Sequence, residues 1–353
     1  MRVDPRKLVR AVVVFACAAL VCGAAAACGG GQPGQEQAAV QAGPRVLTPA
    51  ERVAWYQDCW SHFNNKAWDR FKACYADDVV SEQVDSGHPH AKGFDAMETG
   101  VRTFVSAFPD VKGDLELVLV KGETILGIQV LTGTHTGVLI GPDGMSIPPT
   151  GKPIGIRQAH VVRTDQDGSR VVKEQFYVDS GTLMAQLGLN PTPVRPVAAR
   201  AAAAPTVVVA AGTPAELGNL DLLRKQMAAY NSHDARGVDA YNAPDLVIHD
   251  MAMPADQSAQ EGLAGMQDFF RAFPDVKLAP ESLWAAGSYA IAAGRLTGTN
   301  KGPMPAMGVK RPTGKTVSIQ YLDVTRWENG KLEEEWMFYD GPTFARQLGL
   351  VKQ

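Results

Sequence analysis

Residues 106–112 read Ser-Ala-Phe-Pro-Asp-Val-Lys, and residues 271–277 read Arg-Ala-Phe-Pro-Asp-Val-Lys, 165 positions later. Three further motifs recur in the same order, with offsets that drift only from 165 to 161: Leu-Thr-Gly-Thr at 131–134 and 296–299, Pro-Thr-Gly-Lys at 149–152 and 312–315, and Gln-Leu-Gly-Leu at 186–189 and 347–350. A repeat of this length indicates a duplicated domain rather than a solenoid. The 353-residue chain is therefore expected to contain two copies of one domain.

Each copy begins with helical periodicity and continues with strands. Apolar residues recur every three or four positions within residues 48–75 and again within 214–241. Further helices are expected over 94–108 and 263–273, because both stretches end at a Phe-Pro pair and a residue before proline avoids the α region. Helices followed by strands predict an α+β fold. The expected strands are 115–120, 124–133, 154–163 and 171–179 in the first copy, and 283–296, 317–327 and 332–340 in the second.

These motifs in this order, with Glu174 or Glu335 on the last strand, resemble the SnoaL-like branch of the NTF2-like superfamily. The resemblance covers both copies almost end to end. It implies two tandem NTF2-like cone-shaped domains, each a curved, mostly antiparallel sheet wrapped by N-terminal helices around an apolar pocket. The family includes polyketide and ester cyclases, and its relatives include isomerases, dehydratases and non-enzymatic binders. We place the domains at 48–190 and 214–353, joined by an extended Pro- and Ala-rich linker at 191–213.

The N-terminus has the pattern of a targeting segment. Four basic residues among the first ten precede an apolar run too short to span a bilayer, so residues 1–27 are expected to be a secretory signal peptide. The sequence Ala-Ala-Ala-Cys at 25–28 resembles a bacterial lipobox, with Ala25 in place of the usual leucine. This implies export to the bacterial cell envelope, with Cys28 lipidated and residues 28–47 forming a flexible membrane tether. The alternative is plain cleavage after Ala27.

Two of the five cysteines, Cys59 and Cys74, lie in a folded copy. In an exported domain such a pair suggests a disulfide, which would stabilise the domain by about 3 kcal/mol in the chain-entropy model. Two buried free thiols are the alternative, because spacing alone does not establish that the Cβ atoms meet.

The last hairpin of the first copy predicts a polar pair. Asp167-Gly168 is a hairpin turn signal, so the last two strands are expected to be antiparallel neighbours. A turn centred at position 167 sets His160 directly opposite Glu174, on the face that also carries Phe176. A carboxylate orients an imidazole and raises its basicity, so this pair is a candidate for acid/base catalysis. The alternative is a buried histidine satisfied by the glutamate.

The second copy replaces that histidine by a carboxylate. A turn at Asn329-Gly330 sets Asp323 directly opposite Glu335. Unless solvent separates the two carboxyl groups, one of them keeps its proton near neutral pH. The pair is either a second candidate acid/base site or a solvated end of the pocket.

The resemblance implies further pocket residues. His249 stands where family members often present a polar pocket residue, and its counterpart in the first copy is Glu82. In members that close polyketide rings, an acid/base aspartate directly follows the residue that matches Trp336. The first copy has Phe176 at that position and the second has Met337, and neither side chain transfers protons. The candidate ligand-binding residues on the last strands are Phe176, Trp336, Met337 and Tyr339.

Two functions fit these residues. One is a cyclase or isomerase that acts without a cofactor on a small apolar carbonyl or ester compound. The other is a non-catalytic surface lipoprotein that binds an apolar ligand or mediates association, which the missing aspartate and the export signal favour. No zinc spacing, Gly-rich phosphate loop or nucleophile elbow occurs, so neither a metal nor a nucleotide is expected. A formal net charge of −3 leaves no basic excess for nucleic acid or a lipid surface, so membrane contact is expected through the anchor alone.

The two copies are also expected to associate with each other. Relatives commonly dimerise through their sheets, and Val161 and Val324 point away from the predicted pocket. Apolar surface on that face needs a partner. We therefore expect the two sheets to pack face to face as an internal pseudo-dimer.

Overall fold

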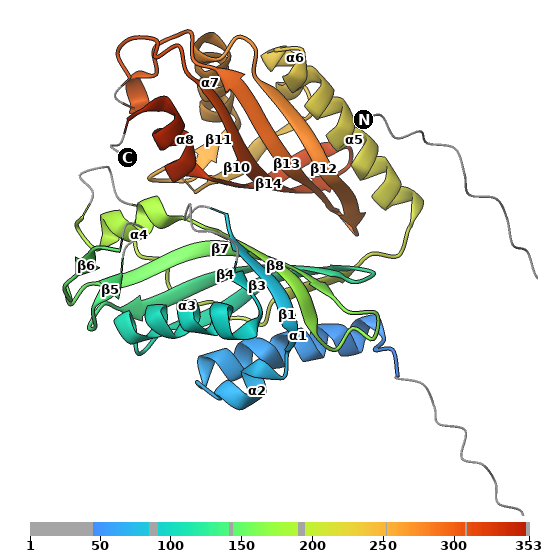
Figure 1. The fold of residues 1–353 in the computed structure, drawn as a ribbon. Coiled ribbons are helices and arrows are strands. Elements are labelled where there is room, and N and C mark those ends of the chain that lie inside the picture. Colours follow the sequence, from blue (N-terminus) through green and yellow to red (C-terminus); the bar gives the residue numbers. More distant parts are fainter. Residues whose placement is uncertain are drawn as a thin grey trace, which may run out of the picture. The chain divides into compact units, whose positions relative to one another are not determined.

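The computed structural model describes residues 45–84, 91–140, 144–189, 195–251, 253–307 and 309–350 (Figure 1). The expected signal peptide, the lipidation site Cys28 and most of the expected tether lie outside these ranges. Among the described residues, no helix has both the length and the apolar character needed to cross a membrane.

The first half of the chain contains the expected helices and strands, but two unpredicted strands, β1 (Tyr75–Gln83) and β2 (Ala91–Lys92), lie between its helices instead of after them. The helices are α1 (Pro49–Asn64), α2 (Trp68–Lys72), α3 (Phe94–Ala107) and α4 (Ser180–Gln186). The remaining strands are β3 (Lys112–Lys121), β4 (Thr124–Thr134), β5 (Leu139–Ile140), β6 (Ser146–Ile147), β7 (Pro153–Thr164) and β8 (Val171–Val178).

The second half repeats this order. Its helices are α5 (Pro214–Asn231), α6 (Ala235–Asp239), α7 (Ala259–Ala272) and α8 (Gly341–Leu348), with a 3₁₀ turn at η1 (Pro305–Met307). Its strands are β10 (Asn242–Asp250), β11 (Gln257–Ser258), β12 (Lys277–Ala286), β13 (Tyr289–Thr299), β14 (Thr316–Glu328) and β15 (Lys331–Tyr339), and β9 (Thr206–Val209) precedes them.

The first helix of each half begins at the same local signal. Thr48 and Thr213 are N-caps whose side chains accept a hydrogen bond from the backbone of Glu51 and Glu216, and each glutamate bonds back to the cap. A proline follows each cap, where its missing N–H costs nothing. These capping boxes set where both helices begin.

Each half builds one mixed sheet. The strand order is β2-β1-β8-β7-β4-β3-β9 in the first and β11-β10-β15-β14-β13-β12 in the second. The pairs β1–β8, β10–β15 and β3–β9 are parallel, and the other neighbours are antiparallel. Helices of the same half cover one face of each sheet, as Figure 1 shows for α1 and α3. We call that covered face the inner face and the opposite one the outer face.

Two of the repeated motifs are bonded to each other in both halves. The backbone N–H of Thr134 donates to Asp110, and that of Thr299 donates to Asp275, both at 2.7 Å. These bonds tie the turn after the Phe-Pro pair to the end of the strand that carries Leu-Thr-Gly-Thr. The two motifs therefore recur together because one holds the other in place.

The segment between the halves is bound to the first sheet instead of hanging free as an extended linker. Strand β9 adds to the edge of β3, and the backbone N–H of Ala198 donates to Gly155 on β7. The Arg200 guanidinium holds both carboxylate oxygens of Asp114, at 2.7 and 2.9 Å. Arg195 donates to Asp256 and to the carbonyl groups of Asp250 and Met253, so the contacts with the first sheet begin at Ala198 and continue to β9.

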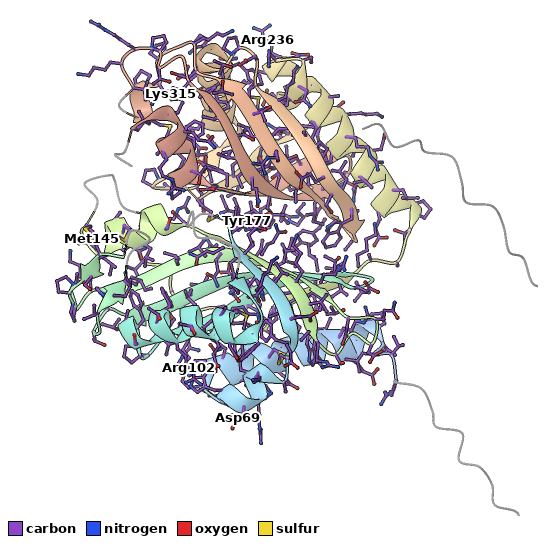
Figure 2. All side chains as sticks on the ribbon, in the orientation of Figure 1. Asp69, Arg102, Met145, Tyr177, Arg236 and Lys315 are labelled. Atoms are coloured by element: carbon purple, nitrogen blue, oxygen red, sulfur yellow. A yellow bond between two sulfur atoms is a disulfide. The ribbon has the colours of Figure 1, made fainter. Side chains whose placement is uncertain are left out.

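The outer faces of both sheets contribute to one buried apolar cluster. Tyr177, labelled in Figure 2, lies in it together with Val324, and Val161 packs against it. A hydrogen bond of 2.6 Å from the Gln320 amide to Glu82 lies beside this cluster. The other buried members are Val84, Leu117, Leu119, Leu126, Ile128, Ala159, Met251, Trp284, Ala286, Tyr289, Ile291, Leu322, Trp336 and Phe338.

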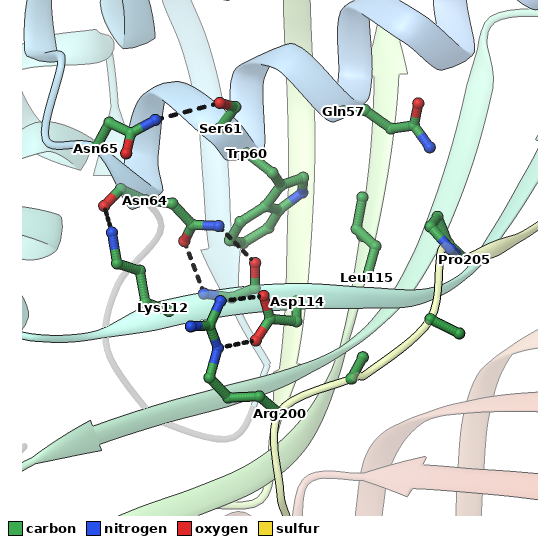
Figure 3. A pocket seen from close by; sticks show the side chains of 13 residues that line it. Gln57, Trp60, Ser61, Asn64, Asn65, Lys112, Asp114, Leu115, Arg200 and Pro205 are labelled. Carbon is green, nitrogen blue, oxygen red and sulfur yellow. Dashed lines mark hydrogen bonds and ion pairs between the residues drawn. The ribbon is translucent and has the colours of Figure 1, made fainter.

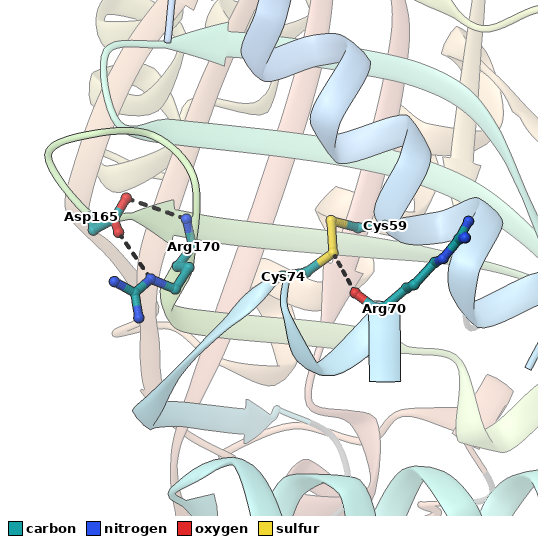
Figure 4. The surroundings of a disulfide bond; sticks show 5 residues. All are labelled: Cys59, Arg70, Cys74, Asp165 and Arg170. Carbon is teal, nitrogen blue, oxygen red and sulfur yellow. Dashed lines mark hydrogen bonds and ion pairs between the residues drawn. A yellow bond between two sulfur atoms is a disulfide. The ribbon is translucent and has the colours of Figure 1, made fainter. Parts of the chain in front are cut away.

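A disulfide joins Cys59 on α1 to Cys74, which immediately precedes β1 (Figure 4). The two Cα atoms are 6.1 Å apart, and the cysteines are 15 positions apart in the chain. Of the two alternatives left open by the sequence, the structure has the bonded pair. The bond ties α1 to the start of the sheet, and α1 carries residues that contact His160.

Candidate functional site

The register of the first hairpin differs by two positions from the predicted one. His160 lies opposite Phe176, and Glu174 lies opposite Val162. The register shift next to Arg163 accounts for one of these positions, and the pairing of Thr164 with Val171 nearer the turn already differs by the other. Because side chains alternate with a period of two, a shift of two leaves every residue on its predicted face. His160 and Glu174 therefore share the inner face and meet diagonally, with 3.1 Å between Nε2 and Oε2.

Aromatic side chains enclose the His160 ring. The Tyr56 hydroxyl lies 3.0 Å from Nδ1, so both ring nitrogens have partners. The ring of Phe176 stacks on the imidazole with centroids 4.1 Å apart, and Trp60 meets it edge-on at 5.5 Å. Tyr56 and Trp60 both come from α1, the helix that the disulfide holds.

Glu174 is enclosed to the same degree. The Ser81 hydroxyl donates to Oε1 at 2.6 Å, while Oε2 meets His160. Burial and the charge of Glu174 raise the pKa of Tyr75 well above its ordinary value. His160 is 2% exposed and Glu174 is 1% exposed. A ligand cannot reach this pair without displacing the aromatic side chains around it.

The second hairpin shows the same shift of two positions. Asp323 lies opposite Met337, and Glu335 lies opposite Thr325, after a register shift at Arg326. Parity is again preserved, so Asp323 and Glu335 share the inner face of the second domain. Both side chains are half-buried, in contrast to the sealed pair of the first domain.

The pKa values of both carboxyl groups in the second domain are raised. Burial, followed by the charge of Glu335, raises the pKa of Asp323 well above its ordinary value. Burial also raises the pKa of Glu335 to about 7, although its bond with Asp323 acts in the opposite direction. Asp323 Oδ1 is buried and has no hydrogen-bond partner among the described residues. The arrangement offers one acid and one base within the same apolar surroundings.

Asp250 belongs to this site, and the sequence reasoning missed it. It lies opposite Met337 on the other side of β15, and its Oδ1 accepts a 3.0 Å hydrogen bond from the Tyr339 hydroxyl. Its charge contributes to the raised pKa of Glu335. The available signal was strand alternation, because Asp250 is the neighbour of the residue that we selected, His249.

The structure corrects the placement of His249 and Trp336. They lie opposite each other on adjacent strands, and both face outward rather than toward the carboxyl pair. His249 pairs with Glu334 at 3.1 Å and with Asp256 at 3.0 Å, and its ring stacks on Trp336 at 5.3 Å. Neither residue lines the inner face. The other three candidates, Phe176, Met337 and Tyr339, do share that face with the polar pairs.

Smaller side chains replace large ones on the inner face of the second domain. Aligning the two domains by their elements gives Leu223 for Tyr56 and Met227 for Trp60 on the first helices. The remaining replacements are Val238 for Phe71, Ala259 for Phe94, Asp323 for His160 and Met337 for Phe176. The aromatic rings that contact His160 therefore have no equivalents at these positions of the second domain, although Tyr321 and Tyr339 stand where the first domain has Gln158 and Val178.

The profile of the SnoaL-like polyketide cyclase family matches residues 50–187 and again residues 220–348. The chain belongs to this family. Its two matches fall on the two structural halves, so the α+β fold with two tandem SnoaL-like domains is confirmed. Membership also makes this a cyclase- or isomerase-type protein whose partner is a small organic molecule.

Solved structures of SnoaL-like and NTF2-like proteins resemble one half at a time. AclR from Streptomyces galilaeus is 24% identical, with a TM-score of 0.36, over 39% of this chain and 85% of its own. TsrD from Streptomyces laurentii is 24% identical, with a TM-score of 0.34, over 38% and 97%. IdmH from Streptomyces antibioticus is 22% identical, with a TM-score of 0.34, over 39% and 99%. No curated protein matches the chain significantly.

This SnoaL-like chain also has a surface hollow of about 500 Å³ beside α1 (Figure 3). Its walls come from α1, from β3 and from the segment around Arg200. Trp60 forms part of the wall and contacts His160 with its ring edge, so the indole separates the hollow from the first polar pair.

Across the part of the chain that the structure describes, no three His, Cys, Asp or Glu side chains are grouped closely enough to hold a metal ion. The acid and the base of the second domain are the carboxyl groups of Asp323 and Glu335.

Proposed function

We propose that this protein is an exported, lipid-anchored SnoaL-like cyclase or isomerase that acts without a cofactor on a small apolar carbonyl or ester compound. We further propose that the chemistry belongs to the second domain. The observation that carries the proposal is the half-buried pair of Asp323 and Glu335, whose pKa values are both raised on an apolar inner face. A pair of carboxyl groups with separated pKa values is the usual composition of an acid/base site.

The proposed reaction is proton transfer next to a carbonyl. Ionised Glu335 removes a proton from the carbon beside the carbonyl, and Asp323 gives its own proton to the carbonyl oxygen. The electron pair of the broken C–H bond forms the double bond of an enol. The enol carbon then attacks a second carbonyl carbon of the same molecule and closes a ring: the π bond of that carbonyl opens, its oxygen takes the proton from Glu335, and the enol hydroxyl returns its proton to Asp323 as the first C=O bond re-forms. In an isomerisation, an enol conjugated to a second double bond takes the Glu335 proton at its far carbon instead, and the enol hydroxyl again returns its proton to Asp323. The pair carries one proton before and after the first step.

The first domain is assigned a structural role in this proposal. Its His160 and Glu174 are nearly inaccessible and bonded to each other, and the remaining His160 Nδ1 and Glu174 Oε1 are already bonded to Tyr56 and Ser81. A reacting group would have to break these bonds and displace the stacked Phe176. The second pair imposes no such cost, because Leu223 stands where the first domain has Tyr56.

The test is proton exchange in the full-length protein. Hexanophenone, an apolar ketone, loses the NMR signal of its α-protons in D₂O when a base removes them. We expect the protein to accelerate this loss and Glu335→Gln to slow it by at least about 100-fold, which is typical of a removed acid/base group. Glu116→Gln is the matched control, because it makes the same carboxyl-to-amide change at a glutamate paired with Arg157 on the first sheet.

Three results would contradict the proposal. The protein accelerates no exchange, Glu335→Gln leaves the rate unchanged, or activity disappears with Glu174→Gln while it survives in Glu335→Gln. The last result would move the active site to the first domain.

A second function is favoured by one observation. Met337 and Phe176 occupy the position of the family's acid/base aspartate, and both face the inner side of their sheets. A lipoprotein that only binds an apolar ligand would retain such residues. Native mass spectrometry of protein from its own host separates the two functions, because a binder carries an unchanged ligand and an enzyme releases a product.

We also propose that the two domains form an internal pseudo-dimer through their outer faces. The shared cluster around Tyr177 and Val324 supports this assembly, since apolar area of that size is rarely left exposed on a separate domain. Localisation in the bacterial envelope rests on the lipobox-like sequence at Cys28.

A further inference from the structure

Two tyrosines face each other on the inner face of the second domain. Tyr321 on β14 lies directly opposite Tyr339 on β15. The Tyr339 hydroxyl donates to Asp250 at 3.0 Å. The Tyr321 hydroxyl is buried and has no hydrogen-bond partner among the described residues, and the residue as a whole is 7% exposed. The two side chains are cross-strand neighbours, but only the Tyr339 hydroxyl has a hydrogen-bond partner.

An unsatisfied buried hydroxyl requires a reason. Folded proteins pair nearly all of their buried polar atoms, and an unpaired one costs stability. Phenylalanine would fill the same space without that cost. We therefore expect the Tyr321 hydroxyl to bond to a ligand.

A second unpaired atom lies on the same strand. Asp323 Oδ1 is also buried without a partner, and Asp323 follows Tyr321 by two residues on the same face. Alternate residues of a strand are about 7 Å apart. The inner face thus carries two unpaired polar groups at a spacing that suits two oxygen atoms of one small molecule.

We propose that Tyr321 is a substrate-contacting residue that donates a hydrogen bond to a second oxygen of the ligand, beyond the carbonyl oxygen that meets Asp323. This inference rests on the proposed function, because it places the ligand at the carboxyl pair. The ligand class is a 1,3-dioxygenated compound, such as a β-keto ester with an apolar substituent. The keto oxygen meets Asp323, and the ester carbonyl oxygen accepts from Tyr321.

The charged surroundings favour Tyr321 as a donor. Burial, together with the charges of Asp323 and Glu281, raises the pKa of its phenol above the ordinary value. The hydroxyl therefore keeps its proton throughout the neutral range, and a carbonyl oxygen is the complementary group.

The first experiment measures thermal unfolding of ligand-free, full-length protein. Tyr321→Phe should leave Tm unchanged or raise it, because it removes an unpaired buried hydroxyl. Tyr339→Phe is the matched control and should lower Tm by about 2 °C, because it removes a bond to a carboxylate. A loss of Tm in Tyr321→Phe as large as in the control would overturn the proposal, since the hydroxyl would then have a partner.

The second experiment measures binding by calorimetry with two probes of matched length. Ethyl benzoylacetate carries both oxygens, and hexanophenone has the same chain without the ester group. The parent protein should bind the keto ester about tenfold more tightly, and Tyr321→Phe should remove that preference while hexanophenone binding stays the same. A tenfold preference corresponds to about 1.4 kcal/mol, the range of one hydrogen bond.

The outcomes separate this inference from the proposed function. Selective binding of the keto ester that depends on Tyr321, without any exchange activity, would support the inference and refute the enzyme. Exchange activity together with an unchanged keto-ester preference in Tyr321→Phe would support the proposed enzyme and refute the inference about Tyr321. If the parent protein binds neither probe, the inference is wrong as well.

Discussion

The Glu335 carboxyl should make folding stability fall as pH rises, and Glu335→Gln should remove this effect. The pKa of this group is about 7 in the folded protein against an ordinary value of 4.5. Below pH 4.5 the group is protonated in both the folded and the unfolded chain. Between these two values the unfolded chain releases the proton and the folded protein keeps it, so the free energy of unfolding decreases as the pH increases.

The magnitude follows from the pKa difference. A rise from 4.5 to about 7 corresponds to about 3 kcal/mol. The Glu335 side chain is half-buried, and screening by solvent reduces this free-energy difference to about 2 kcal/mol. Relative to the parent protein, Glu335→Gln should therefore gain about 2 kcal/mol in free energy of unfolding between pH 4.5 and pH 7.5.

Urea unfolding at four pH values in this window, followed by tryptophan fluorescence, measures the effect. Asp275→Asn is the control, because the backbone N–H of Thr299 holds the pKa of Asp275 below its ordinary value of 3.8. Stability from a depressed pKa is lost only as pH falls toward that value and below it, so the cost of Asp275→Asn should be constant above pH 4.5. A difference between Glu335→Gln and the parent that does not change with pH would refute the buried carboxyl pair.

Three further predictions concern the anchor, the disulfide and the domain contact. Cys28→Ala should release the protein from the membrane fraction, and unchanged fractionation would exclude a lipid anchor. Replacing Cys59 and Cys74 by serine should lower the free energy of unfolding by about 3 kcal/mol, and two thiols alkylated in freshly unfolded protein would show that the disulfide is absent. Truncation after residue 212, which keeps β9 on the edge of β3, should leave a first domain that dimerises or aggregates, because half of the shared cluster becomes exposed; a stable monomer in light scattering would count against the pseudo-dimer.

The repeat motifs predicted the fold because they are structural contacts. The side chain of Gln186 bonds both backbone groups of Gly155, at 2.9 and 3.0 Å, and Gln347 does the same at Ser318, at 2.7 and 3.1 Å. Each glutamine belongs to a Gln-Leu-Gly motif, and each strand residue follows a Pro-Thr-Gly-Lys motif closely. Motifs that hold each other keep their order and spacing, which is the pattern that a sequence reveals.

The hairpin registers could not be derived in full from the sequence. The turn dipeptides located both turns, but nothing in the side chains near Arg163 or Arg326 marks the register shift in either hairpin. The error of two positions was harmless for the inner face, because parity decides which side chains meet. It did change the contact of His160 with Glu174 from directly opposite to diagonal.

The alternation of side chains along a strand also explains why the prediction for His249 on β10 was wrong. We selected His249 for its chemistry, whereas the parallel register sets Ile248 and Asp250 on the inner face. No turn of known type joins β10 to its partner β15, because the two strands are distant in the chain. Without a connecting turn, the residue numbers alone do not tell which residues of the two strands lie opposite each other.

The polar side chains at equivalent positions of the two domains, His160 and Asp323, differ in whether their polar atoms have hydrogen-bond partners. In the first, His160 has a partner at each ring nitrogen and aromatic rings on three sides, so the polar group adds no unsatisfied atoms. In the second, Asp323 and Tyr321 each keep a buried atom without a partner, and such atoms cost about 1–3 kcal/mol each. A ligand that bonds both of these atoms would recover part of that cost in the second domain, whereas the pair of His160 and Glu174 offers no ring nitrogen without a partner.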